Sequence, residues 1–230
     1  MKILVNFPSR NRPYKLISIL NQLILLAGDL TKIHFHLSLD SNDESMNNDQ
    51  MIKTLKGYSE KYPISYNFDT STNKINAINR DMKVVSKMYD WNILMLMSDD
   101  MVPQVQGWDT LIREAMILNF PDTDGALHFF DGFRNDLITL PIMGKKYYKR
   151  FNYIYSPAYE SFWTDNEMTL VAYGLKKAVF IDTCIVKHMH PAWIGMDAWD
   201  KLYESNQEAY ERDEKVFNDR KNIISIYRSN

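Results

Sequence analysis

The chain has 230 residues, 45% of them hydrophobic and 24% charged, which is an ordinary globular composition and enough chain to bury a sizeable core. A net charge of −2, with lysines and arginines spread along the sequence, gives no footprint for duplex nucleic acid, and no apolar run approaches the roughly 18 residues of a membrane span. The single cysteine, Cys184, excludes an intrachain disulfide and fits a reducing compartment, so we expect a soluble, cytoplasmic protein.

The first hundred residues alternate between expected strands and expected helices. Short apolar or alternating runs predict strands at residues 2–7, 33–39, 64–68 and 91–97. Apolar residues at helical spacing, with Pro13 at one start and Asn73 as a cap at another, predict helices at 13–27, 49–59 and 73–89. This alternation is typical of a mainly parallel α/β sheet flanked by helices.

The second half of the chain has a less regular pattern. We expect a helix at 107–119, a strand at 125–130, a helix from about 165 to 174, a strand at 178–187 and a terminal helix from 197 to about 220. Residues 131–163 contain proline, glycine and many aromatic residues and show no clean period. No internal repeat or low-complexity linker is visible, which indicates a single domain that spans residues 1–230.

Two adjacent carboxylates, Asp99 and Asp100, follow the apolar strand at 91–97. Ligand sites of open α/β sheets lie at the carboxyl ends of such strands. Neighbouring carboxylates repel each other unless a cation or hydrogen-bond donors offset their charge, and hard oxygen ligands suit Mg²⁺ or Mn²⁺ carrying a phosphorylated substrate. The pair indicates a metal site for a nucleotide-type ligand. The alternative is a solvated turn, because aspartate is common in turns.

A second candidate cluster is the turn Pro8-Ser-Arg-Asn-Arg-Pro13, directly after the first strand. It brings Arg10, Arg12 and a helix N-terminus to the carboxyl edge of the sheet, which suits a diphosphate, although a solvated turn explains it too. The chain has no glycine-rich phosphate loop and no dinucleotide-binding fingerprint.

Further chemistry-bearing residues follow in the second half of the chain. Asp165 and Glu167, in Trp163-Thr-Asp-Asn-Glu167, open a helix, where simple N-capping is the alternative explanation. His188 and His190 follow the strand at 178–187, and their i and i+2 spacing puts them on one face of an extended segment. A histidine at a strand end can supply the ligand that two aspartates leave missing.

Taken in order over roughly residues 1–195, these motifs resemble glycosyltransferases of the GT-A fold, close to the family 2 inverting enzymes. The first strand and the turn containing Pro8 resemble the first nucleotide-binding loop of that family, and Asp40 matches the acidic residue that reads the base. Asn73-Lys-Ile-Asn-Ala-Ile-Asn79, which contains Lys74, resembles the segment that closes over the donor. Ser98-Asp-Asp100 resembles the "DXD" motif, whose later aspartate holds the metal.

The resemblance also assigns roles to the second half. Trp163-Thr-Asp-Asn-Glu167 is similar to the Trp-Asp-Asp-x-Glu motif of galactofuranosyltransferase-like members, which implies that Asp165 is the general base and Glu167 an acceptor-binding carboxylate. The family's metal-binding histidine corresponds to His188 or His190, with His188 nearer the strand end. The chain departs from the pattern by Ser98 and Thr164 in place of acidic residues, and it lacks the Gln-x-x-Arg-Trp motif of processive synthases.

The resemblance therefore implies one GT-A domain with a nucleotide-sugar-binding half at 1–101, an acceptor and catalytic half at 102–195 and a C-terminal helix at 196–230. The implied activity is Mn²⁺- or Mg²⁺-dependent transfer of a hexosyl or pentosyl group, with inversion, from a nucleoside-diphosphate sugar to a carbohydrate or other hydroxyl acceptor. A UDP-sugar is the favoured donor. In this assignment Pro8, Arg10, Arg12, Asp40, Lys74, Asn79 and Asp99 bind the donor, and Asp100 with His188 or His190 binds the metal. The alternatives are a sugar nucleotidyltransferase and a non-catalytic nucleotide-sugar- or carbohydrate-binding module.

Overall fold

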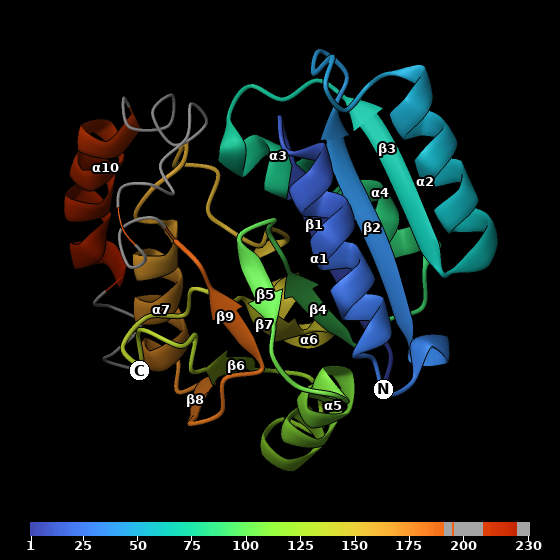
Figure 1. The fold of residues 1–230 in the computed structure, drawn as a ribbon. Helices are drawn as coiled ribbons and strands as arrows, with labels where there is room; N and C mark the ends of the chain where they lie inside the picture. Colours follow the sequence, from blue (N-terminus) through green and yellow to red (C-terminus); the bar gives the residue numbers. More distant parts are fainter. Residues whose placement is uncertain (191–194, 196–208, 225–230) are drawn as a thin grey trace.

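A seven-stranded sheet lies at the centre of the computed structural model, which describes residues 1–190, 195 and 209–224 (Figure 1). The strand order is β3-β2-β1-β4-β7-β6-β8. Parallel pairing joins β3 (Ile64–Asp69), β2 (Ile33–Asp40), β1 (Ile3–Ser9) and β4 (Ile93–Leu96). The sheet continues through β7 (Ile142–Gly144), antiparallel to both neighbours, to β6 (Ala126–Phe129) and its parallel partner β8 (Ala178–Ile181). This confirms the expected α/β class with a mainly parallel sheet.

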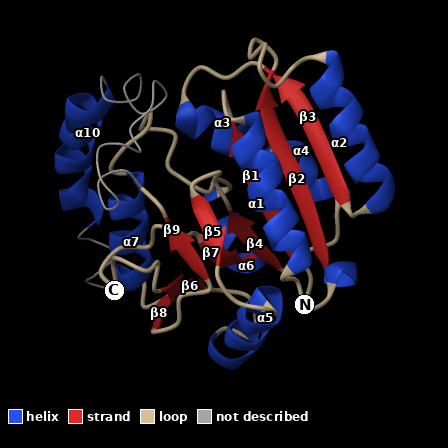
Figure 2. Cartoon of the chain, in the orientation of Figure 1, coloured by secondary structure: helices blue, strands red, loops and turns tan. Residues whose placement is uncertain are grey.

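Helices cover both faces of the sheet (Figure 2), because successive strand side chains point to opposite faces. Ile3, Val5 and Phe7 of β1 belong to one buried cluster, whereas Leu4 belongs to another. The first cluster receives apolar residues from α1 (Pro13–Leu25), α2 (Asp49–Lys61) and α5 (Trp108–Asn119). The second receives them from α3 (Lys74–Arg80), α4 (Met82–Met88), α6 (Lys145–Phe151) and α7 (Thr164–Gly174).

Most predicted elements of the first half are present with small changes of boundary. A 3₁₀ turn, η1 (Leu30–Lys32), precedes β2 and was not predicted. The single helix expected at 73–89 is instead the pair α3 and α4, which meet at Asp81. The carboxylate of Asp81 is buried and accepts hydrogen bonds from Arg80 at 2.9 Å and from the amide of Asn67 at 3.1 Å, so this polar junction faces the sheet.

The prediction of one strand at 178–187 is wrong, because this part of the chain forms two strands in two different sheets. After β8 the chain turns at residues 182–185, and β9 (Val186–His188) then pairs antiparallel with β5 (Met101–Pro103). In this two-stranded ribbon Met101 lies opposite His188. The ribbon thereby places His188 beside Met101, which directly follows Asp99 and Asp100 in the chain.

The terminal helix α10 (Ala209–Ile224) confirms the later part of the expected C-terminal helix, whereas residues 197–208 of that prediction lie outside the described residues. In the irregular stretch at 131–163, β7 and α6 were not predicted. Within the part of the chain that the structure describes, no helix has the length and apolar character needed to cross a membrane.

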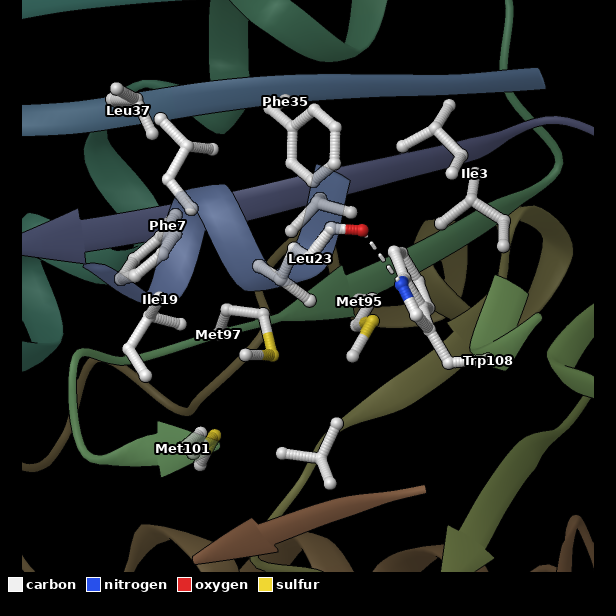
Figure 3. Packing of buried hydrophobic residues seen from close by; sticks show 14 of the residues in the cluster. Ile3, Phe7, Ile19, Leu23, Phe35, Leu37, Met95, Met97, Met101 and Trp108 are labelled. Atoms are coloured by element: carbon white, nitrogen blue, oxygen red, sulfur yellow. Dashed lines mark hydrogen bonds between the residues drawn. The ribbon is translucent and has the colours of Figure 1, made fainter. Parts of the chain in front are cut away.

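Trp108 locks α5 to α1 and to the sheet. Its side chain is fully buried, and its indole Nε1 donates a 3.0 Å hydrogen bond to the carbonyl oxygen of Leu23 at the end of α1 (Figure 3). Met95 and Met97 belong to the same buried cluster, and Met95 is the nearer of the two to this ring. The indole thus contributes both apolar packing and a satisfied polar contact.

We predict that Trp108→Ala lowers the free energy of unfolding by about 3–5 kcal/mol, because it leaves a large cavity and an unpaired carbonyl. Urea unfolding followed by circular dichroism measures the change. Leu118→Ala is the matched control on the same helix, since that side chain is 82% exposed and its loss should change stability by less than about 0.5 kcal/mol. Equal effects of the two substitutions would contradict this assignment of the core.

Candidate active site

A cavity of about 430 Å³ opens where β1, β2 and β4 end. The chain leaves β1 toward β2 on one side and later returns to β4 on the other side, so the cavity lies at the topological switch point where α/β sheets bind ligands. Its lining comes from the turn after β1, the end of β2, residues 96–101, the starts of α3 and α7, and β9. The sequence-predicted clusters therefore meet in one place.

Asp99 ties the turn after β1 to the end of β4. Its two carboxylate oxygens accept hydrogen bonds from Ser9 Oγ at 2.6 Å and from an Arg12 guanidinium nitrogen at 2.8 Å. The side chains of Arg12 and Asp99 are only 9% and 5% exposed, and burial raises the pKa of Asp99, while Arg12 and Ser9 oppose that change. Because both oxygens are engaged, Asp99 organises Arg12 more directly than it could hold a metal.

Asp100 faces the β5–β9 ribbon instead. Its Oδ1 accepts a hydrogen bond from Ser98 Oγ, and its Oδ2 lies 3.7 Å from His188 Nε2. The backbone of Met189 donates to the Asp100 carbonyl at 2.8 Å, which fixes the two segments against each other. The carboxylate and the imidazole that the sequence analysis placed in one metal site are therefore neighbours in space.

His190 lies in the same cavity, with its ring centre 5.5 Å from that of His188. Burial lowers the pKa of His190 to about 4, with the neighbouring His188 lowering it further, so its imidazole is neutral at pH 7 and suited to a metal. The Nδ1 atom of His188 is buried and has no hydrogen-bond partner among the described residues.

The carboxylate of Asp100 fits either Mn²⁺ or Mg²⁺, the ions expected from the sequence, whereas the imidazole nitrogens favour a transition metal such as Mn²⁺ over Mg²⁺. Across residues 1–190, 195 and 209–224, however, no cluster of three or more histidine, cysteine, aspartate or glutamate side chains could hold a metal. A cation at Asp100 would therefore need additional oxygen ligands from a bound substrate, as Mg²⁺ commonly takes from phosphates.

The cavity wall at the end of β2 is built on Asp40. One carboxylate oxygen accepts from Arg10 at 2.6 Å, and the other accepts from Ser71 Oγ at 2.5 Å and Arg80 at 3.2 Å. Arg10 also donates to the Asn42 side chain at 2.8 Å. This network fixes Arg10 against the end of β2, and Pro8, Arg10 and Asp40 all line the cavity.

Asp165 enters the cavity from the first turn of α7. Burial raises its pKa, while the backbone N–H of Asn166 and the positive charge of Lys74 oppose the rise. Lys74 lines the same cavity from the start of α3. A carboxylate with a raised pKa and an open path to a ligand has the properties of a general base.

Two expected site residues do not line the cavity. The side-chain amide of Asn79 donates to the Tyr155 carbonyl at 2.7 Å and accepts from the Ile154 N–H at 2.9 Å, so it braces the chain behind the cavity rather than facing a donor. Glu167 is 4% exposed and bound by Arg220, which does not fit the expected acceptor-binding role. Asn79 lies in the last turn of α3 and Glu167 on the buried side of α7.

The structure also adds residues that the sequence analysis missed. Ser9, Ser71 and Thr139 all line the cavity. Ser9 could have been found from its place in the turn that was already singled out. Thr139 lies in the irregular stretch without a usable period, and Ser71 donates a hydrogen bond to Asp40.

No protein-family model and no curated protein sequence matches this chain. Comparison with solved structures does give matches. The mannosyltransferase PcManGT from Pyrobaculum calidifontis, in complex with GDP-Man and Mn²⁺, has a TM-score of 0.61 at 11% identity over 84% of this chain and 58% of its own. S. aureus TarS has a TM-score of 0.62 at 14% identity over 83% of this chain and 37% of its own.

A complex of S. aureus TarS 1-349 with UDP-GlcNAc gives a TM-score of 0.59 at 16% identity, over 82% of this chain and 60% of that one. At such identities the likeness concerns the fold, and it confirms the GT-A-like α/β fold that the motif resemblance implied. The chain spans less than two thirds of the length of each of these structures.

The buried Arg12–Asp99 pair leads to a pH-dependent prediction. In Arg12→Met the carboxylate loses its cationic partner, so its pKa rises further in the folded state. A protein loses stability as pH rises when one of its carboxyl groups binds its proton more tightly in the folded state than in the unfolded state. We expect the variant's deficit in unfolding free energy to be smallest near pH 4 and to reach about 3–5 kcal/mol at pH 7.

Denaturant unfolding at several pH values measures that deficit. The double variant Arg12→Met/Asp99→Asn is the control, because it removes the titrating group and should remove the pH-dependent part of the deficit. A deficit in Arg12→Met that stays constant from pH 4 to pH 7 would contradict the coupling.

Proposed function

We propose that this protein is a metal-dependent glycosyltransferase that moves a sugar from a nucleoside diphosphate to an acceptor hydroxyl with inversion. One observation carries the proposal: a single cavity at the switch point of the sheet contains an arginine-bearing turn, the Asp100–His188 pair and Asp165. The fold likeness to nucleotide-sugar transferases supports it.

The donor end of the reaction uses the turn after β1. Arg12, held by Asp99, and Lys74, at the start of α3, bring positive charge to the wall where a diphosphate would lie. Asp40, fixed by Arg10 and Arg80, lines the far part of the same edge and would contact the nucleoside. A UDP-sugar is the first donor to test, although the structural neighbours include both GDP-Man and UDP-GlcNAc complexes.

Asp100 and His188, with His190 beside them, would hold the metal. When bound, Mn²⁺ or Mg²⁺ would neutralise the charge of the leaving diphosphate, a contribution of several kcal/mol. The hydrogen bond from Ser98 orients the Asp100 carboxylate, and the neutral imidazole of His190 has a nitrogen lone pair available for a cation.

Asp165 would accept the proton of the acceptor hydroxyl. As that proton moves to the carboxylate, the acceptor oxygen forms its bond to the anomeric carbon from the side opposite the diphosphate. The bond between the anomeric carbon and the diphosphate oxygen breaks, and its electron pair leaves with the diphosphate. Phe162 and Trp163 line the cavity next to Asp165 and offer aromatic surface to a sugar acceptor.

The metal and base roles separate in two variants. We expect a matching nucleoside-diphosphate sugar to raise the melting temperature only with Mn²⁺, equivalent to about 2.7 kcal/mol at a hundredfold excess over its Kd. Asp100→Asn should lose this shift. Asp165→Asn should keep it and lose about 10²–10⁴-fold in transfer rate.

A thermal-shift screen of UDP-, GDP-, dTDP- and CDP-sugars, each with and without Mn²⁺, identifies the donor before transfer is assayed. Normal turnover by Asp165→Asn would contradict the assignment of Asp165 as the general base. Donor binding by the wild type without transfer to any acceptor would favour a non-catalytic binding module instead.

The pH profile of transfer tests the environment of Asp165. A general base works when deprotonated, so kcat falls as pH drops through its pKa, and burial places this fall above the range of an ordinary aspartate. Lys74→Met removes a charge that lowers that pKa, so the acid limb of kcat should move to higher pH. Lys53→Met, an exposed lysine on α2, is the control and should leave the limb in place. An acid limb that Lys74→Met leaves unmoved would argue against Asp165 as the titrating base.

A further inference from the structure

The C-terminal helix α10 packs beside α7 (Figure 1), and one of its faces meets the segment that carries Asp165. Its contact residues are spaced three and four apart and so form one stripe of the helix: Tyr210, Asp213, Phe217 and Arg220. All four contact residues 159–167, which run from the end of the irregular stretch into the first turn of α7.

Asp213 holds the start of this segment. Its side chain is fully buried, and its carboxylate accepts hydrogen bonds from three consecutive backbone N–H groups: Glu160 at 3.0 Å, Ser161 at 2.7 Å and Phe162 at 2.8 Å. Arg212 pairs with the same carboxylate at 2.8 Å. A loop whose N–H groups point inward needs such an acceptor, because buried donors without partners are costly.

Arg220 holds the other end. Its guanidinium binds both oxygens of Glu167 at 2.7 and 2.8 Å, and Tyr159 donates to the same carboxylate at 2.7 Å. Two parallel hydrogen bonds fix orientation as well as distance. Glu167 lies two residues after Asp165, so this pair sets the rotation of the first turn of α7.

Between the two anchors, Trp163 adopts φ 63°, a left-handed conformation that non-glycine residues rarely take. Its ring stacks on Phe217 at 5.3 Å between centroids and meets Tyr210 at 5.7 Å. Strained backbone persists where its surroundings hold it. Here the surrounding groups belong to α10, and the strained residue, Trp163, lies two positions before Asp165.

The segment is also tied to the donor side of the cavity, because the backbone N–H of Ile75 donates to the Glu160 carbonyl at 3.1 Å. Ile75 follows Lys74 in α3. The segment is therefore held between α3 on one side and α10 on the other.

We propose that α10 is a positioning element for the reaction, with Asp213 and Arg220 as positioning residues that fix Asp165 in the cavity without touching substrate. This inference rests on the proposed function for its effect on rate. It does not depend on that function for its effect on the segment itself, and the two effects are measured separately.

The first test uses Asp213→Asn, which keeps the shape of the side chain but loses the charge and one acceptor oxygen. Asp219→Asn is the matched control, since Asp219 is an exposed aspartate on the same helix. Hydrogen exchange of the folded protein without substrate should speed up at the amides of residues 160–162 in Asp213→Asn only. In transfer assays kcat should fall on the order of 10²-fold, with the donor Kd unchanged, because the base is displaced while the donor site is intact.

A graded pair at Arg220 covers the case in which Asp213→Asn does not fold. Arg220→Lys keeps the charge but loses the bidentate contact, and Arg220→Met loses both, so kcat should decrease from wild type to Lys to Met. Unchanged exchange at 160–162 in Asp213→Asn, or wild-type kcat in the folded variants, would overturn the proposal. No transfer by the wild type, with exchange still accelerated in Asp213→Asn, would overturn the proposed function and leave α10 as the clamp of this segment.

Discussion

The ion pair between Arg12 and Asp99 is the interaction on which the candidate site depends. It joins the turn after β1 to the residues after β4, at the point where the chain changes direction across the sheet. Because Asp99 is fully occupied by Arg12 and Ser9, its neighbour Asp100 is left to face the β5–β9 ribbon. Two adjacent aspartates thus have different environments, one buried and paired and the other directed at a histidine. Adjacent like charges are tolerated at a sheet edge in this way, since each is balanced by a different partner.

The fold and most of the site could be predicted from the sequence because they follow local patterns. Strands buried on both faces read as apolar runs, and polar residues directly after β1, β2 and β4 must meet at one edge when those strands are parallel. This reasoning singled out Arg12, Asp99 and Asp100, whereas Asp40 came from the resemblance of the ordered motifs. The order of the motifs then added Asp165, which no single pattern would have distinguished from a capping residue.

What the sequence could not supply is the set of contacts that depend on tertiary pairing. The short ribbon of β5 and β9 has three residues in each strand, too few for a period, yet it decides which histidine lies beside Asp100. Asn79 and Glu167 matched family positions by spacing, but the direction of a helical side chain depends on what the helix packs against. Asn79 faces the chain at 154–155 and Glu167 faces Arg220, so both serve the architecture around the cavity.

The contact of Asp213 with residues 160–162 spans 51 to 53 positions of the chain, and this separation has a consequence for assembly. The Arg12–Asp99 pair spans 87 positions but lies wholly within the first hundred residues, whereas the segment at 160–162 must wait for Asp213 of α10. During synthesis the cavity wall built on β1, β2 and β4 can therefore form before the segment at 160–162 receives its support from α10. The two parts of the cavity thus become ordered at different stages of chain growth.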